Sequence, residues 1–249
     1  GITVETTNGT LTVQGGTSDR AAARIGHGGT QNNGAHNGAI SATATGDITV
    51  ASGGPATGNW NSAQIGHGGL QSNGNRSGTI DVISSAGGIS VDSSGTGGVA
   101  NQDSFSMIGH GGRNSTGNSS DNITVNAAND LSVLGGTRDR AFALIGHGGH
   151  NVDGVHSGDI DIDVGSDGSG NLLISGGSGV DSFAMIGNGG NDSDAGAGTH
   201  SGEIHVDVGF SVEGTPISTE GIAGTGTIQL NGGGANNSFA QIGHGGANV

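Results

Sequence analysis

Short stretches of alternating apolar and polar residues run along the whole chain. GDITVAS (46–52) and GTIDVIS (78–84) alternate as a strand does when one of its faces is buried. No stretch keeps helical spacing for more than one turn, and the many glycines would weaken a helix. The blocks are bounded by Gly, Asn, Ser and Asp, which favour turns. The pattern predicts an all-β chain of short strands.

Three kinds of apolar block recur in a fixed order. The first two have the form I-x-V or L-x-V, and the third is the near-invariant segment IGHGG with the residues just before it. The first block begins at Ile2, Ile40, Ile80, Ile123, Ile160 and Ile204, the second at Leu11, Ile48, Ile89, Leu131, Leu172 and Ile228, and the third is centred on Ile25, Ile65, Ile108, Ile145, Ile186 and Ile242. Self-similarity at a fixed period is the strongest signal of a repeat architecture. We therefore divide a single domain, 1–249, into six repeats of about forty residues: 1–38, 39–78, 79–121, 122–158, 159–202 and 203–249.

Short strands, turn residues and a fixed period together predict a parallel β-helix, or β-solenoid. Each repeat offers about seven inward-pointing apolar residues, counted from the alternation. That number suits one triangular coil per repeat with Gly/Asn-rich loops, and equivalent residues would then stack about 4.8 Å apart. Two coils of about twenty residues per repeat are the alternative. Neither end of the chain has a polar cap, so we expect exposed strand edges there, in a segment of a longer rod or a subunit that stacks end to end.

Composition narrows the function classes. Glycine accounts for 57 of 249 residues and the aromatic residues are five Phe and one Trp, so the core must use Ile, Val, Leu and Ala. Without cysteine there is neither a disulfide nor a thiolate metal site. The net charge of −15, with six Arg and no Lys, should repel nucleic acid. No run of 18 apolar residues encodes a membrane span.

The third block raises the question of what its histidine does. In FALIGHGG, alternation puts Ala143, Ile145 and His147 on one face and Phe142 and Leu144 on the other. The small residues before each Ile mark the first face as the inner one, whereas the varied residues on the second face predict partial exposure. The inner histidines would then stack as a column: His27, His67, His110, His147, Asn188 in place of one histidine, and His244.

A structural column, a metal site and a catalytic base remain as interpretations of these residues. An imidazole donates from one nitrogen and accepts with the other, and Asn can do a similar job. A catalytic base would not be exchanged for Asn so freely, and a metal column would lose a ligand at Asn188. The flanking glycines permit the positive φ values that a corner needs. The structural column is therefore favoured.

Two further sets of residues recur in register. An aromatic stripe occupies the position three before the third-block Ile, as a surface binding platform or as a packed stripe under a loop: Phe105, Phe142, Phe183 and Phe239. A polar position precedes the first block, and its variety predicts a solvated turn: His36, Arg76, Ser119, His156 and His200.

One local cluster is the sharpest metal candidate. GHGGHNVDGVH brings together His147, His150, Asp153 and His156 within ten residues, and imidazole with carboxylate suits Zn or Ni. The spacing matches no standard zinc signature. Asp159, Asp161 and Asp163 share one side of a strand, as calcium ligands or as an acidic outer face. We expect no cofactor, with Ca or Zn as the alternative.

The I-x-V pairs followed by A-x-IGHGG make the chain resemble the repeats of filamentous haemagglutinin, a family of large bacterial exoproteins often exported by two-partner secretion. The resemblance covers essentially the whole chain and rests chiefly on the recurring IGHGG. It implies a right-handed parallel β-helix, an extracellular location and an adhesive or scaffolding role. It carries over no catalytic residues.

These observations predict a structural and adhesive rod segment at a bacterial cell surface, and no enzyme. Its expected partners are further copies of itself or a larger parent chain, with a cell-surface receptor or glycan as an additional partner. A cation-binding module and a carbohydrate-active β-helix enzyme are the alternatives. An ice-binding module would need regular T-x-T ladders, of which TATGDITV is an isolated instance.

Overall fold

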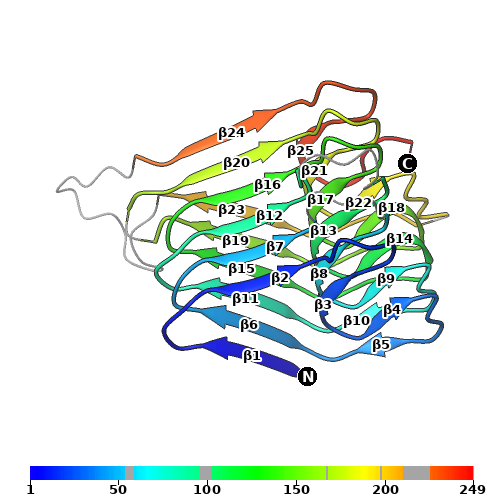
Figure 1. Ribbon diagram of the computed structural model, residues 1–249, viewed down its shortest axis with the longest axis horizontal. Coiled ribbons are helices and arrows are strands. Elements are labelled where there is room, and N and C mark those ends of the chain that lie inside the picture. Colours follow the sequence, from blue (N-terminus) through cyan, green and yellow to red (C-terminus); the bar gives the residue numbers. More distant parts are fainter. Residues whose placement is uncertain (54–58, 96–101, 167, 197, 210–224, 249) are drawn as a thin grey trace.

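The computed structural model describes residues 1–53, 59–95, 102–166, 168–196, 198–209 and 225–248. Within these ranges the chain forms strands β1 to β25 and no helix, and so no helix that could span a membrane. Strands β1 and β24 lie at opposite ends of the stack of strands (Figure 1).

Four sheets contain nearly all the strands. Sheet A has the order β1 (Ile2–Thr6), β6 (Ile40–Ala44), β11 (Ile80–Ser84), β15 (Ile123–Ala127), β19 (Ile160–Val164) and β23 (Ile204–Val208). Sheet B has the order β2 (Leu11–Gln14), β7 (Ile48–Ala51), β12 (Ile89–Asp92), β16 (Leu131–Leu134), β20 (Asn171–Ser175) and β24 (Thr227–Asn231). Both sheets are built from the I-x-V and L-x-V blocks.

Sheets C and D lie on either side of the glycine-histidine segment. Sheet C has the order β3 (Ala23–Ile25), β8 (Ala63–Ile65), β13 (Phe105–Ile108), β17 (Phe142–Ile145), β21 (Ala184–Ile186) and β25 (Ala240–Ile242). Sheet D has the order β4 (Gly28–Thr30), β9 (Gly68–Leu70), β14 (Gly111–Thr116), β18 (Gly148–Asp153) and β22 (Gly189–Asn191). A short pair, β5 (His36–Asn37) with β10 (Arg76–Ser77), precedes the return to sheet A.

The strands pair in parallel and in register. Ile40 pairs with Ile2 on one side and with Ile80 on the other, and Ile65 pairs in the same way with Ile25 and Ile108. Along the chain, the strands visit sheets A, B, C and D in turn before returning to sheet A (Figure 1). The prediction of an all-β chain with stacked parallel sheets is confirmed.

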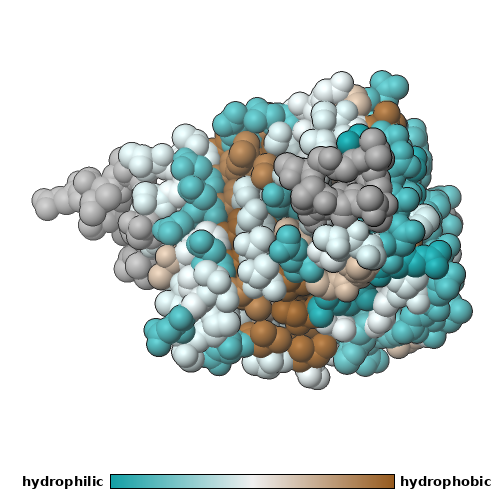
Figure 2. Space-filling model, viewed as in Figure 1, coloured by the Kyte–Doolittle hydropathy of each residue, from teal (hydrophilic) through white to brown (hydrophobic). Residues whose placement is uncertain are grey.

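The main core lies between sheets A, B and C. In β6 and β11, alternate residues are buried, as the apolar alternation requires. Isoleucines and valines from sheets A and B pack against the Ala and Ile side chains of sheet C, among them Ile40, Val50 and Ile145. On the face seen in Figure 2, a narrow apolar band lies between hydrophilic regions.

A second apolar cluster lies on the opposite face of sheet C, where partial exposure was predicted. That prediction was wrong, because Met107, Leu144 and Met185 are fully buried together with the phenylalanines beside them. The chain bends sharply after the third-block Ile, which lets the preceding side chain fold over the glycine segment. The side-chain amide of Gln64, for example, donates from Nε2 to the Gly109 carbonyl at 2.9 Å. The residue types just before the third-block Ile therefore vary because the interior there offers both apolar side chains and backbone carbonyls, and not because the position faces solvent.

Candidate functional site

The IGHGG segment forms the bend between sheets C and D, and its glycines are required there. Gly66 has φ +147° and Gly68 has φ +118°, both in the region that L side chains rarely adopt. A Cβ added to Gly66 would collide with the carbonyl of Gly109 in the neighbouring strand connection. The bend can stack on its neighbours only if glycine occupies these positions, which leaves the histidine between them as the one side chain with room.

The histidine rings form a column. Ring centroids are 5.0 Å apart for His27 and His67, 4.8 Å for His67 and His110, and 4.9 Å for His110 and His147, with nearly parallel planes. The Nδ1 atom of each ring accepts the backbone N–H of the histidine before it in the column, at 2.9 Å between His27 and His67 and 3.0 Å between His67 and His110. The column is thus bonded along its length.

The second ring nitrogen ties the column to the chain that returns toward sheet A. His67 Nε2 bonds to the Gly38 carbonyl at 2.9 Å, and His110 Nε2 bonds to the Gly78 carbonyl at 2.8 Å. In the same way, His147 Nε2 bonds to the Asp121 carbonyl at 2.7 Å. Because Nδ1 accepts a backbone N–H, it carries no proton, and the Nε2 that meets a carbonyl must donate. Each of these imidazoles is therefore the neutral Nε2–H tautomer.

The surroundings hold the imidazoles in that neutral form. Burial lowers the pKa of His147 to about 4, and the hydrogen bond to the Asp121 carbonyl opposes this only in part. Burial also lowers the pKa of His110 well below its usual value, with the neighbouring His147 adding to the effect. Protonation would add a proton to Nδ1, which would then face the backbone N–H that it now accepts, and that hydrogen bond would be lost. A neutral histidine held in this way joins two backbone segments through its two ring nitrogens, and burial keeps it from being protonated.

Asn188 reproduces the bonds of the histidine it replaces. Its Oδ1 accepts the His147 N–H at 3.0 Å, as Nδ1 does elsewhere. Its Nδ2 donates to the carbonyls of Gly158 at 2.9 Å and Ser201 at 2.8 Å. The column then continues, since the Asn188 N–H bonds to Nδ1 of His244 at 3.0 Å. The amide fits because the site needs one acceptor and one donor in fixed places.

The four residues of the sequence-predicted metal cluster do not converge. His147 is engaged in the column, and His156 stacks on His200 with 5.0 Å between ring centroids. His150 lies toward Asp181 and Asp192 instead, and Asp153 is exposed. In the part of the chain that the structure describes, no three His, Asp or Glu side chains gather closely enough to hold a metal ion.

The polar position before the first block was predicted to be a solvated turn, and this prediction was wrong for three of its five residues, whereas His36 and His200 are half-buried. Arg76, Ser119 and His156 are almost completely buried. They pair in register with their equivalents, as in the bridges from Ser119 to Arg76 and to His156, and so lie in a stacked interior. Burial lowers the pKa of His156 to about 3. Variety at this position reflects different ways of filling a polar interior.

The phenylalanine stripe is a column too, but it is not a surface feature. Successive ring centroids lie 5.1, 4.8 and 5.0 Å apart from Phe105 through Phe142 and Phe183 to Phe239. Phe105, Phe142 and Phe183 are at most 1% exposed, and Phe239 is partly buried against them. The surface platform is therefore ruled out for Phe105, Phe142 and Phe183, which belong to the second apolar cluster.

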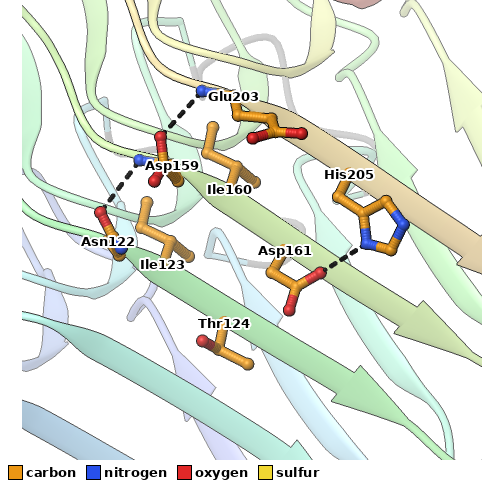
Figure 3. Close-up of a pocket in the computed structure, with 8 residues that line it drawn as sticks. All are labelled: Asn122, Ile123, Thr124, Asp159, Ile160, Asp161, Glu203 and His205. Carbon is orange, nitrogen blue, oxygen red and sulfur yellow. Dashed lines mark hydrogen bonds and ion pairs between the residues drawn. The ribbon is translucent and has the colours of Figure 1, made fainter. Parts of the chain in front are cut away.

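The acidic side of β19 lines a shallow pocket with β15 and β23 (Figure 3). The Asp159 N–H donates to Asn122 Oδ1 at 3.0 Å, and the Glu203 N–H donates to Asp159 Oδ1 at 2.9 Å. His205 bonds Asp161 at 3.0 Å, which raises the pKa of His205. These side chains bridge successive strands at an open surface, so their main visible role is to hold the register.

No family model, curated protein or solved structure matches this chain.

Proposed function

We propose that the chain is a rigid structural and adhesive rod segment, a stack of six triangular coils with one coil for each repeat. The histidine/asparagine column is the observation that carries this proposal. Residues about forty positions apart pair directly, which supports one coil per repeat, and sheets A, B and C around the main core support the triangular outline. The proposal excludes an enzyme role for the column, because both nitrogens of its inner imidazoles are already bonded.

End-to-end stacking of copies is the second part of the proposal. By the pattern of the column, His27 presents Nδ1 toward one open end, and His244 presents its N–H toward the other. A second copy would continue both the column and the four sheets. At the β24 end, Ile228 is 51% and Leu230 is 44% exposed, whereas Ile48 and Val50 at equivalent places in β7 are buried. Covering these side chains favours stacking.

Electron microscopy of the purified 249-residue chain tests this assembly. We expect filaments that persist in EDTA for the unchanged chain. Leu230→Lys puts a charge in the stacking surface and should leave short rods. Thr49→Lys, on the outer side of β7, is the matched control and should still form filaments. Short rods from the unchanged chain would contradict self-assembly, and filaments that dissolve in EDTA would point to a bridging metal.

The proposed setting is the outside of a bacterial cell, with a surface receptor or glycan as the partner. The support is the resemblance of the IGHGG repeats to those of secreted bacterial exoproteins. Antibodies against the chain should label intact producing cells, and external protease should remove that label. Labelling that requires permeabilised cells would contradict this location.

A further inference from the structure

Two columns of side chains face each other along the side of the stack, outside the phenylalanine column. The first, here the loop column, takes the residue five before each third-block Ile, always with left-handed φ between 54° and 68°: Arg20, Trp60, Asp103, Arg140, Asp181 and Asn237. The second, here the sheet D column, takes the third residue of each sheet D strand: Thr30, Leu70, Arg113, His150 and Asn191.

Polar contacts between the two columns close the groove over part of its length. Arg113 Nη2 bonds Asp103 Oδ1 at 2.8 Å, and His150 Nε2 lies 3.8 Å from Asp181 Oδ2. The phenylalanines stack through the same repeats, from Phe105 to Phe183. That column ends at Phe105, because the two preceding equivalents are Ala22 and Ser62.

A hollow of about 270 Å³ lies in the groove where the phenylalanine column ends. Trp60 and Leu70 give it an apolar wall, and Gln71 and Asn114 give it two amide groups. Arg20, Asp103 and Arg113 complete the lining. Small-ligand pockets are concave, partly apolar and carry a few fixed polar groups, and span roughly 300–1,000 Å³. This hollow is slightly smaller than that range, which suits a single sugar ring and not a larger ligand.

The hollow is locally cationic in an acidic protein. Arg113 is only 7% exposed, and its Nε has no hydrogen-bond partner. The Asp103 carboxylate is shared between Arg113 and Arg140, so it does not neutralise both. The Arg20 guanidinium lies 5.2 Å from the centre of the Trp60 ring, over its face. Two of the six arginines of a chain with net charge −15 therefore line this hollow, against a single carboxylate, that of Asp103.

We propose that the hollow binds one carboxylated sugar residue, such as a uronic acid at the end of an otherwise neutral glycan. Arg113 and Arg20 would take the carboxylate, since guanidinium groups bind carboxylates through paired hydrogen bonds. Gln71 and Asn114 would bond hydroxyl groups, and the apolar face of the ring would lie on Trp60 and Leu70. The net negative charge of the protein disfavours a long polyanion, which is why a single acidic residue is specified. This site does not depend on end-to-end stacking.

Ligand-observed NMR titration of the 249-residue chain with D-glucuronate and D-galacturonate tests the site. We expect saturable binding of at least one acid, about tenfold or more tighter than that of D-glucose or acetate. Trp60→Ala and Arg20→Gln should each weaken it by about tenfold, a loss of about 1.4 kcal/mol. These two positions are preferred to Arg113, whose ion pair also supports the fold.

Asn237→Ala is the matched control, since it lies in the same column far from the hollow, and it should bind as the unchanged chain does. No saturation with either acid would overturn the proposal. Glucose that binds as tightly as the uronic acids would show that the arginines play no role, which would overturn the proposal. Acetate that binds as tightly would show that the hollow is a simple anion site, which would also overturn it. Unchanged binding by the Trp60 variant would place the sugar elsewhere.

Discussion

At the scale of single residues, the histidine column depends on geometry more than on the imidazole itself. Asn188 meets the same two demands as histidine, one acceptor toward the preceding residue of the column and one donor toward the returning chain. The sequence alone made the column predictable, because a position that accepts His and Asn but is flanked by glycine needs a compact donor and acceptor. The tautomer could not be predicted, since it follows from which neighbour donates.

Substitutions at His147 separate these two demands. His147→Asn should cost about 1 kcal/mol or less of the free energy of unfolding, because an amide keeps one acceptor and one donor. His147→Ala leaves the His110 N–H and the Asp121 carbonyl without partners and opens a cavity, so it should cost about 3–5 kcal/mol. Urea unfolding monitored by circular dichroism measures both. Equal costs for Asn and Ala would show that the bonds of the column contribute nothing.

At the scale of strands and bends, the alternation of apolar and polar residues predicted three of the four sheets. Sheets A, B and C follow from apolar residues at every second position, as in β11. Sheet D was missed, because β4, β9 and β22 are three-residue strands that begin with two glycines and carry no alternation. The burial of Gln64 was missed for a related reason. Its amide bonds to backbone carbonyls that only the bend brings near.

The bend itself can be tested at one glycine. Gly146 has φ +144°, and a Cβ there would collide with the Gly187 carbonyl, so Gly146→Ala should cost about 3 kcal/mol or more. Gly9→Ala is the matched control, since no atom lies within 4 Å of its added Cβ, and it should change stability by about 0.5 kcal/mol or less. Thermal and urea unfolding give both values. Comparable stability of the two variants would contradict the close stacking of the bends.

At the scale of the whole molecule, the same stacked sheets enclose two apolar clusters and a set of buried polar side chains. Sheet C separates the main core from the phenylalanine cluster, and the histidine column lies where sheet C meets sheet D. The groove and its hollow escaped sequence reasoning. Arg20, Trp60 and Asp103 look unrelated until their shared left-handed φ shows that they occupy equivalent places.

The buried histidines make the stability of the whole molecule sensitive to acid. The folded-state pKa of His147 is about 4, below the value of about 6.5 for an unfolded histidine, so the unfolded chain takes up protons first as the pH falls. The stabilisation is complete above about pH 6.5 and is lost as the pH falls toward 4. His147 alone should account for about 3 kcal/mol.

Urea unfolding at pH values between about 7.5 and 4.5 measures this loss, which should start well above the range where carboxylates titrate. His147→Asn should show a shallower pH dependence, since one titrating group is gone. Identical slopes for the two proteins would mean that His147 is not held neutral.

The direction of the hydrogen bonds in the histidine column has a consequence for any filament built from this chain. Each ring accepts from one side, while the backbone N–H beside it donates to the other. Two copies meeting head to head would bring acceptor against acceptor, and tail to tail would bring donor against donor. Only head-to-tail stacking pairs the acceptor at one end of a copy with the donor at the facing end of the next. Such a filament has polarity, with chemically different tips that would elongate at different rates.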